Sequence, residues 1–410
     1  MTATETQATQ PRLDTGVPGL DKILHGGFIA GRSYFVSGGA GAGKTTLGLH
    51  FLAQAAPEDS LLVSLSEPQA NIRADARTIG LDIDETHCID ISPTAQTAGT
   101  RGSYTLLEPW DAEPLDLLTR ISDTFKEKLP KRIFLDALSQ YRHHFPDAYQ
   151  FRRQVLELLE YLSRCGVTVL ISSEAGSAAD EDLQYLGDGM LRLAATPSAR
   201  TLSVAKFRGS GFSEGEHTVR LTDGGMRVFE CLVPAEHHRN FTAERLSSGV
   251  DEVDVVTGGG LDRGTVTLLS GPSGVGKTTL GAQFMREAAS LGERSVIFSF
   301  EERTGTLLFR CQSIGIPLDD VLQQGTLLVR EIEPLRYGPD EFASEVRREV
   351  EAGGAQIVMI DSLAGYRQSV QGGQPRAPCP RLVSLSGKHG RDGPADQRNG
   401  HHRRRRGQGV

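Results

Sequence analysis

Gly38-Gly-Ala-Gly-Ala-Gly-Lys44-Thr45 stands between a strand-like apolar stretch and a helix-like one. The pattern GxxxxGK[ST] is typical of a loop that binds phosphate groups. Its glycines let backbone N–H groups converge on the phosphates without interference from Cβ atoms, and the N-terminus of the following helix adds partial positive charge. Lys44 is expected to reach the outer phosphates, and Thr45 to place its hydroxyl on Mg²⁺. The stretch therefore predicts a strand, a loop and a helix that hold ATP or a close relative.

A second copy of this pattern lies 233 residues further along the chain. Gly271-Pro-Ser-Gly-Val-Gly-Lys277-Thr278 is again expected to follow a strand. The offset stays constant without a gap over roughly 40 residues that begin at Arg12 and at Arg245, which indicates a duplicated domain of roughly 230 residues. The residues expected to hold the two nucleotides are Gly38, Gly39, Ala40, Gly41, Ala42, Gly43, Lys44, Thr45 and Thr46 in the first copy, and Gly271, Pro272, Ser273, Gly274, Val275, Gly276, Lys277, Thr278 and Thr279 in the second.

Both copies alternate strand-like and helix-like stretches. Short apolar runs rich in β-branched residues are separated by runs of helical periodicity, of which the clearest is Phe151–Ser163. Strands that alternate with helices imply a mainly parallel sheet covered on both faces, so the predicted fold class is α/β, with one such domain in each copy. In the first copy the expected strands are Ser33–Val36, Ser60–Leu65, Ile133–Leu135, Val167–Ile171 and Leu202–Ala205.

Each phosphate loop is followed by an apolar run that ends in aspartate. Residues 132–136 are Arg-Ile-Phe-Leu-Asp, and residues 357–361 are Ile-Val-Met-Ile-Asp. Besides the loop hydroxyl, Mg²⁺ requires a carboxylate, which the end of such a strand can supply. The alternative is an ordinary strand end that an aspartate caps. The residues expected to bind the metal are Thr45 and Asp136 in the first copy and Thr278 and Asp361 in the second.

Hydrolysis also needs a group that positions or deprotonates the attacking water. In the second copy the strand-like run Ser295–Phe300 leads into Glu301-Glu302, whereas the matching stretch of the first copy ends in Ser66-Glu67. We expect Glu67, Glu301 and Glu302 to act as catalytic carboxylates. The alternative is a solvated charge that follows a strand.

Negative charge that develops on the outer phosphate calls for a cation as well. Lys206-Phe-Arg208-Gly-Ser follows the expected strand Leu202–Ala205. Lys206 and Arg208 are therefore candidate catalytic cations, and a solvated strand edge is an equally compatible interpretation.

Composition indicates a globular protein with an acidic body. The 410 residues are 38% hydrophobic and 23% charged, and no apolar run approaches the ~20 residues of a membrane span. Five scattered cysteines form no CxxC pair, which disfavours zinc and disulfides and favours a cytoplasmic protein. The last 37 residues carry a net charge of +7 and the preceding 373 carry −15. Because an acidic body repels nucleic acid, we expect no nucleic-acid partner.

Domain boundaries follow from the repeat. We expect a disordered start at 1–10, a first domain at 11–232, a polar linker at 233–244, a second domain at 245–373 and an aberrant tail at 374–410. His237 and His238 in the linker are not expected to bind a metal, because nothing nearby completes a ligand set.

Taken in order along the chain, these residues resemble the KaiC family of the RecA-like ATPase superfamily. The resemblance covers about residues 11–373 and includes the phosphate loops, the glutamates and the strand-end aspartates. It also includes the lead-in Gly19-Leu20-Asp21 with Gly26-Gly27, and the stretch Lys206–Ser210. Two tandem copies in one chain are its most specific feature.

The resemblance implies two RecA-like P-loop domains in an ATP-hydrolysing, Mg²⁺-dependent regulatory protein. It further implies a double-ring homohexamer with ATP between subunits, in which Lys206 and Arg208 reach a neighbour's nucleotide. Assembly would then be required for hydrolysis. Family members serve circadian timing, signalling or regulation, and some phosphorylate their own Ser or Thr in the second copy. Protein partners other than the chain itself are not specified by the resemblance.

The chain departs from the family at two places. Ser66 replaces one glutamate, which puts the turnover of the first site in doubt. After Gly373 the patterning stops, and no second Lys-x-Arg-Gly-Ser follows. Codons for Gly390–Asn399, shifted by one nucleotide, permit Gly-Val-Thr-Val-Leu-Leu-Ile-Asn-Glu-Thr, which parallels Gly166–Glu174. We therefore hypothesise a frameshift, natural or from sequencing, between about Gly373 and Lys388, which the encoding DNA would test.

The second copy then lacks its later strands. A parallel sheet without inner strands leaves apolar edges unpaired, so we expect the second copy to fold weakly or to aggregate. The family's phosphorylation sites fall in the missing part, so autokinase activity is not carried over. The alternative interpretation of residues 374–410 is a basic tail that binds nucleic acid or acidic partners.

Two other classes of function share these motifs. A DNA-dependent ATPase of the RecA/RadA recombinase or helicase type has the same core, but the acidic body and the lack of a basic stripe with aromatic residues disfavour it. Stimulation of ATP hydrolysis by single-stranded DNA would identify this class. A nucleotide-gated scaffold with little turnover is favoured by Ser66 and by the incomplete second copy.

Overall fold

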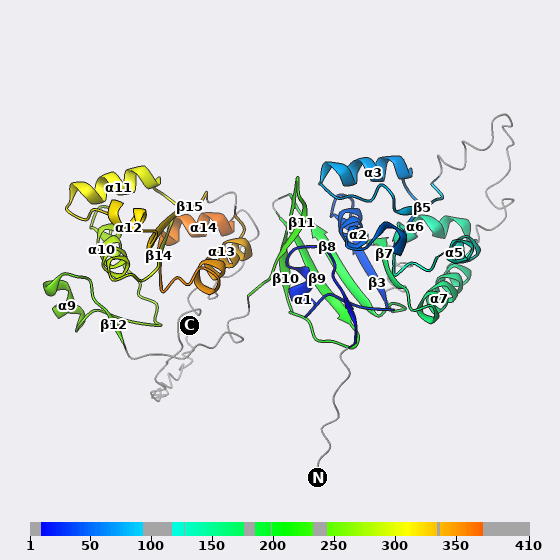
Figure 1. The fold of residues 1–410 in the computed structure, drawn as a ribbon, viewed down its shortest axis with the longest axis horizontal. Helices are drawn as coiled ribbons and strands as arrows, with labels where there is room; N and C mark the ends of the chain where they lie inside the picture. Colours follow the sequence, from blue (N-terminus) through cyan, green and yellow to red (C-terminus); the bar gives the residue numbers. More distant parts are fainter. Residues whose placement is uncertain are drawn as a thin grey trace, which may run out of the picture.

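Two α/β domains lie side by side in the computed structural model (Figure 1). The structure describes residues 10–92, 117–126, 128–175, 185–197, 199–232, 244–333 and 337–371. We call residues 10–232 the first domain and residues 244–371 the second. The expected N-terminal segment, linker and tail lie outside the described residues, apart from Gln10 and Glu244. Among the described residues, none of the helices has the length and hydropathy that crossing a bilayer requires.

The first domain has helices between most of its strands as far as β7, and its described elements from β7 onward are strands alone. Its elements are β1 (Arg12–Leu13), α1 (Leu20–Ile23), β2 (Phe28–Ile29), β3 (Ser33–Gly38), α2 (Lys44–Ala53), β4 (Ser60–Ser64), α3 (Gln69–Thr78), β5 (His87–Asp90), α5 (Leu117–Phe125), β6 (Arg132–Asp136), α6 (Leu138–Tyr141), α7 (Ala148–Arg164), β7 (Thr168–Glu174), β8 (Gly189–Ala195), β9 (Arg200–Phe207), β10 (Glu216–Thr222) and β11 (Gly225–Phe229), with 3₁₀ turns at Pro57–Asp59 and Arg142–His144.

One nine-stranded sheet carries the first domain, in the order β11-β10-β9-β8-β3-β7-β6-β4-β5. The six strands from β8 to β5 are parallel, which confirms the mainly parallel sheet that the sequence predicts. The other three, β9, β10 and β11, extend it as an antiparallel meander that the sequence pattern did not foresee. The expected strand at 202–205 is part of β9, which is antiparallel to both of its neighbours, β8 and β10.

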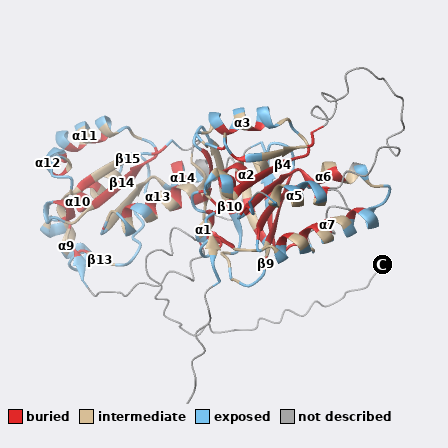
Figure 2. Ribbon diagram, turned by 45° about the vertical axis from the view of Figure 1, so that its right-hand side comes forward, coloured by how far each residue is buried: buried red, intermediate tan, exposed pale blue. Residues whose placement is uncertain are grey.

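Helices cover both faces of the parallel strands. Tyr34 and Val36 of β3 belong to the core that α1, α2 and α3 complete, whereas Phe35 belongs to the core with α5, α6 and α7. Successive residues of a strand point to opposite faces, so an entirely apolar run marks a strand buried on both sides. All of β3 is buried accordingly, and Figure 2 shows the buried strands in red beneath their helices.

The second domain contains a smaller sheet. Three parallel strands in the order β15-β14-β16 match β5-β4-β6 of the first domain. Helices α10, α11 and α12 cover one face, and α13 and α14 cover the other. The elements are β12 (Arg245–Leu246), α9 (Asp251–Thr257), β13 (Leu261–Asp262), α10 (Lys277–Ser290), β14 (Ser295–Ser299), α11 (Thr304–Ser313), α12 (Asp319–Gln323), β15 (Leu327–Glu331), α13 (Pro339–Glu351), β16 (Ile357–Asp361) and α14 (Leu363–Gln371).

The strand expected before the second phosphate loop is not formed, and this part of the sequence prediction is wrong. Residues 265–270 correspond to residues 32–37, and so to most of β3, but form no strand, and Val266 and Leu268 are 48% and 68% exposed. In the first domain β3 pairs with β7 and β8, and the described part of the second domain contains no counterpart of either strand. Without ladder partners the segment's backbone groups are left to water. β16 borders the same gap and is half-buried where β6 is buried.

Candidate functional site

Both phosphate loops have the same backbone form and end at the N-terminus of a helix, α2 or α10. Gly41 and Gly43 have φ angles of 69° and 104°, and Gly274 and Gly276 have 81° and 97°. These left-handed values strain any residue with a Cβ, which explains glycine at the four positions. In the first loop Gly38 and Ala42 are buried, whereas the second loop is exposed from Gly271 to Val275. Thr46 and Thr279, the third residues of their helices counted from the lysines, are half-buried.

Each loop lysine folds back onto its own loop. Nζ of Lys44 donates to the carbonyls of Gly38 and Gly39 at 2.7 and 3.0 Å. Nζ of Lys277 donates to the carbonyls of the two matching residues, both at 2.9 Å. The two positive charges therefore lie on the loops that are expected to hold the phosphates.

A loop hydroxyl and a strand-end carboxylate meet in both domains. Thr45 Oγ1 donates to Asp136 Oδ2 at 2.8 Å, and Thr278 Oγ1 donates to Asp361 Oδ2 at 2.8 Å. Asp136 is 4% exposed and also accepts a hydrogen bond from the hydroxyl of Ser172 in β7. Asp361 is half-buried, since no strand like β7 covers it among the described residues. The four predicted metal ligands are thus brought together in two equivalent pairs.

These groups fit a magnesium nucleotide. Hydroxyl and carboxylate oxygens are the hard ligands that Mg²⁺ prefers, and one pair leaves room for ligands from phosphate and water. The N–H groups of a glycine-rich turn at a helix N-terminus, together with a lysine, complement a phosphate chain. No group of three or more His, Cys, Asp and Glu side chains suited to a metal occurs in the described part of the chain.

The loops that carry the predicted catalytic carboxylates are anchored alike in both domains. A serine hydroxyl at the end of β4 donates to the carbonyl of Glu67 at 2.5 Å, and the matching hydroxyl at the end of β14 donates to that of Glu302 at 2.6 Å. Glu67 is therefore the counterpart of Glu302, and Ser66 that of Glu301. Glu67 is exposed.

Glu301 and Glu302 have different partners. Glu301 accepts a hydrogen bond from the hydroxyl of Ser362, which directly follows Asp361. Glu302 forms an ion pair of 2.7 Å with Arg310 on α11. Glu301 thus contacts the residue that follows Asp361, the predicted metal ligand, whereas the carboxylate of Glu302 is paired with an arginine.

Lys206 and Arg208 lie at the opposite end of the sheet from the first phosphate loop. Through β8, Leu202 of β9 lies level with Gly38, whereas Phe207 lies level with the start of β3. Lys206 and Arg208 are four and six residues beyond Leu202, which at ~3.3 Å per residue places them ~13 and ~20 Å from the loop along the strand. The structure therefore does not bring them to the nucleotide site of their own chain.

Positive charge gathers at that end of the sheet. Arg208 and Arg32 line a cavity of about 680 Å³ together with Asp188. Nζ of Lys206 donates to the carbonyl of Gly187 at 2.6 Å. Burial, followed by the neighbouring charge of Arg208, lowers the pKa of Lys206 below its ordinary value.

Sequence reasoning missed two polar side chains at the first site. Arg200, at the start of β9, donates through Nε to the carbonyl of Gly41 at 3.3 Å. Only the antiparallel direction of β9, which no local pattern revealed, brings this residue to the loop. Ser172 binds the carboxylate of Asp136, as described above; a serine near the end of an apolar strand was a signal that the sequence did contain.

Comparison with known proteins identifies the family. The family model described as "ATPase: KaiC" matches residues 13–232 and 246–387. Similar proteins include the circadian clock oscillator protein KaiC of Acaryochloris marina, 27% identical over 374 residues that cover 87% of this chain and 70% of the relative. The protein of the same name from Parathermosynechococcus lividus is 26% identical over 378 residues, which cover 88% of this chain and 68% of the relative. Both matched ranges contain a phosphate loop with its threonine and aspartate, and the chain therefore belongs to the KaiC family of ATPases.

Proposed function

We propose that this chain is a KaiC-like regulatory protein of the cytoplasm that binds ATP with Mg²⁺ at two loops and hydrolyses it. The observation that carries the proposal is the contact of a loop threonine with a strand-end aspartate, 2.8 Å in each domain. A glycine-rich turn, a lysine and a helix N-terminus accompany the contact in both domains, as a magnesium nucleotide requires.

Each residue has a role in this proposal. Lys44 and Lys277 would bind the outer phosphates, and the two threonine–aspartate pairs would hold Mg²⁺, which neutralises phosphate charge when bound. Glu301 would orient or deprotonate water at the second site, where its carboxylate is not paired with Arg310. Glu302 and Glu67, which occupy matching positions, would act as catalytic carboxylates at the second and the first site.

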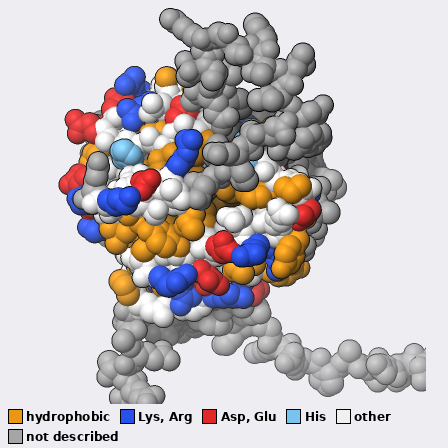
Figure 3. Space-filling model, turned by 90° about the vertical axis from the view of Figure 1, so that its right-hand side faces the viewer, with side chains coloured by type: hydrophobic (Ala, Val, Ile, Leu, Met, Phe, Trp, Pro, Cys, Tyr) orange, Lys and Arg blue, Asp and Glu red, His pale blue; other side chains and the backbone are white. Residues whose placement is uncertain are grey.

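Hydrolysis would also require the cations of a second copy. Because Lys206 and Arg208 lie four and six strand residues from the level of their own loop, we propose that they act on the nucleotide of a neighbour in a homo-oligomer, as in the family's hexameric rings. Tyr149 and Leu156 on α7 are 77% and 40% exposed, and Figure 3 shows apolar side chains gathered on the side of the first domain that carries α5 and α7. Exposed apolar areas of this kind often mark interfaces.

Lysine substitutions test the proposal site by site. Lys44→Ala should remove ATP binding at the first loop and Lys277→Ala at the second, so the double variant should retain none. Equilibrium dialysis at millimolar Mg²⁺ counts the bound nucleotides, and phosphate release measures the turnover. Nucleotide retained by the double variant at wild-type affinity would refute the assignment of both sites.

A nucleotide-gated scaffold is the second candidate. Ser66 at the position of Glu301 favours slow turnover at the first site, and the second domain has no described counterpart of β9 to offer a cation. Under this alternative the two loops bind ATP with the same lysine dependence, but phosphate release stays near the uncatalysed rate.

A further inference from the structure

Strand β10 faces both domains at once. Val219 and His217 are 3% and 0% exposed and point into the first domain. Thr218 and Arg220, on the other face of the strand, contact α13 of the second domain, which lies beside β10 and β11 in Figure 1. Side chains of a strand alternate between its faces, so one strand can report the state of one domain to the other.

The N-terminal end of α13 supplies the opposing groups. Thr218 Oγ1 donates to Asp340 Oδ2 at 2.8 Å, and Arg220 Nε donates to Glu341 Oε2 at 2.9 Å. Asp340 is 5% exposed, and the side chain of Glu341 is 17% exposed. A Cβ placed on Gly338 would lie 3.4 Å from Thr218 Cγ2. The two backbones therefore approach closely at this point.

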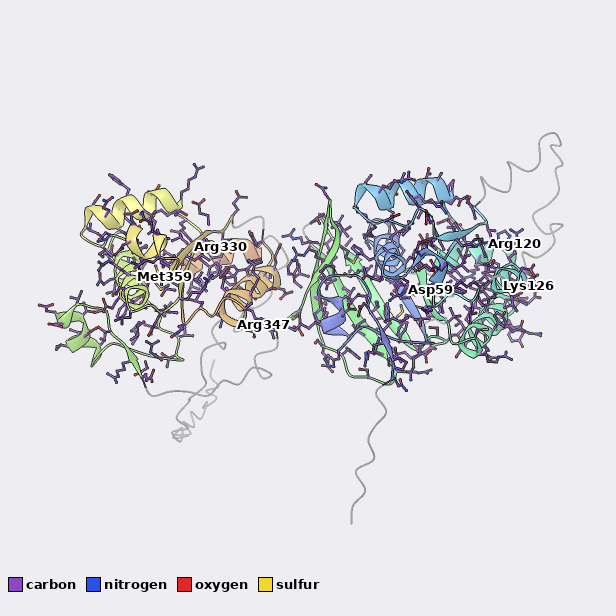
Figure 4. All side chains as sticks on the ribbon, in the orientation of Figure 1. Asp59, Arg120, Lys126, Arg330, Arg347 and Met359 are labelled. Carbon is purple, nitrogen blue, oxygen red and sulfur yellow. The ribbon has the colours of Figure 1, made fainter. Side chains whose placement is uncertain are left out.

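A second charged contact lies further along the same helix. Arg347, on the side of the second domain that faces the first in Figure 4, pairs with Glu230 at 3.3 Å. Glu230 also pairs with Lys22 of α1 at 2.9 Å and accepts from the hydroxyl of Ser213 at 2.8 Å. The side chains of Arg347 and Glu230 are 19% and 16% exposed. Docking thus involves charges that are largely removed from water.

The far end of β10 leads to the first phosphate loop. A Cβ placed on Gly43 would lie 2.7 Å from Met226 Cε and 3.3 Å from Leu221 Cδ2, so the tip of the β10–β11 hairpin packs against the loop. The backbone N–H of Met226 also donates to Nε2 of His50 in α2, at 2.8 Å. Leu221 directly follows Arg220, and only one peptide unit separates the contact with α13 from the contact with the loop.

We propose that the docking latch, defined as Asp340, Glu341 and Arg347 of α13 with Thr218, Arg220 and Glu230 of the first domain, couples the position of the second domain to nucleotide binding at the first phosphate loop. The coupling rests on the proposed function of that loop. Docked α13 holds the hairpin tip on Gly43 and favours the loop form that binds phosphate. When two sites are coupled in this way, the affinity of one site typically changes by 5-fold or more between the two states of the other.

Docking can be measured without nucleotide. Thr218→Cys with Gly338→Cys places two thiols within disulfide reach, and residue 338 has an extended backbone that accepts cysteine. Mild oxidation should cross-link the domains within one chain, as peptide mapping and unchanged mass would show. Adding Arg220→Glu should slow cross-linking about tenfold, and adding Glu341→Arg as well should restore the rate, since the ion pair is re-formed with its charges exchanged. The single-cysteine variants serve as controls.

Coupling is measured as the affinity of the first site for a fluorescent ATP analogue in the Lys277→Ala background. Arg220→Glu should weaken binding about 5-fold, and the exchanged pair should recover it. A disulfide between two chains, or none, would overturn the intramolecular latch. Slow cross-linking with unchanged affinity would overturn the coupling. Absence of binding in the Lys277→Ala parent would instead refute the proposed function of the first loop, while the cross-linking result would still decide the docking.

Discussion

Ser66 occupies the position at which the second domain has Glu301. In the second domain Glu301 contacts Ser362, which follows the proposed metal ligand Asp361. A hydroxyl is a much weaker base than a carboxylate, and a positioned general base contributes about 10²-fold or more to a rate. We therefore expect Ser66→Glu to raise ATP turnover at the first site at least about tenfold. Phosphate release in the Lys277→Ala background would measure this site alone.

Ser66→Gln provides the matched control, because glutamine has the size of glutamate and cannot take up a proton. Its turnover should stay at the level of the parent. Equal acceleration by both variants would show that bulk rather than basicity limits the first site, and would contradict the role assigned to Glu301.

His50 should make the first domain less stable in acid. Burial lowers the pKa of His50 below its ordinary value near 6.5, although a backbone hydrogen bond to Gly16 acts in the other direction. The unfolded chain therefore binds a proton that the folded chain resists, so the stability that neutral His50 provides is present above pH 6.5 and is lost as the pH falls below it. The free energy of unfolding, measured with urea between pH 5 and 8, should depend less steeply on pH for His50→Gln than for the parent. The amide oxygen of the glutamine can still accept a hydrogen bond from Met226 N–H.

His217 shares this behaviour and calls for a parallel variant. Burial lowers its pKa as well, and its ring nitrogens contact the carbonyl of Ser213 and the N–H of Cys231. His217→Gln and the double variant separate the two contributions. An unchanged pH slope in the double variant would contradict both assignments. At pH 7 and above, where His50 is neutral, His50→Ala should lower the free energy of unfolding by about 1–3 kcal/mol, because it leaves the buried N–H of Met226 without its acceptor.

At the scale of elements, the sequence predicted strands best where burial is complete. The run 132–136 coincides with β6, and the run 60–65 differs from β4 only at its last residue; both strands are buried on both faces, as an entirely apolar run predicts. The antiparallel direction of β9 escaped prediction, since strand direction depends on partners far away in sequence. For the same reason Arg200 was missed at the first loop. The phosphate loops themselves were predictable from the sequence, because their positive φ angles require glycine and depend only on local backbone geometry.

The segment 265–270 shows how far a local pattern can determine a strand. Its residues resemble those of β3, but the described part of the second domain provides no ladder partner, and the segment stays exposed. Local sequence supplies the propensity for a strand, and tertiary pairing decides whether it forms. The second phosphate loop keeps its shape nonetheless, because the contact of Thr278 with Asp361 fixes the start of α10.

Hydrogen exchange should separate the two equivalent segments. Amides of β3 bond to two neighbouring strands and should exchange only when the first domain opens as a whole, whereas amides of 265–270 should exchange at nearly the unprotected rate. Peptide-resolved mass spectrometry at micromolar protein measures both. Protection of 265–270 that grows with protein concentration would indicate that another chain supplies the missing strand at the open edge of β16. If residues 265–270 were as strongly protected as β3 at every protein concentration, the description of 265–270 as an unpaired segment would be contradicted.

For the whole molecule, the distance between the two halves of the proposed catalytic machinery, the first phosphate loop and the pair Lys206 and Arg208, has a direct consequence. A phosphate loop and a lysine–arginine pair at opposite ends of one sheet cannot serve the same nucleotide within one chain. Two copies placed head to tail can bring them together, and repetition of that contact around an axis closes a ring. The first domain has both halves, whereas the described part of the second has only the loop.

Mixing two inactive variants tests this arrangement. Lys44→Ala destroys the loop but keeps Arg208, and Arg208→Ala keeps the loop but removes the cation; both carry Lys277→Ala so that only first sites contribute. Each alone should be impaired, by about 10³-fold for the arginine variant if that cation stabilises transferring phosphate as arginine fingers do. After subunit exchange, an equimolar mixture should regain about a quarter of the parent's activity, because one contact in four joins an intact loop to an intact arginine.

Activity of the mixture equal to the mean of the two separate proteins would mean that Arg208 acts within its own chain or not at all. Arg200→Ala provides the contrast, since Arg200 contacts the loop of its own chain at 3.3 Å, and a mixture of Arg200→Ala with Lys44→Ala should show no such gain.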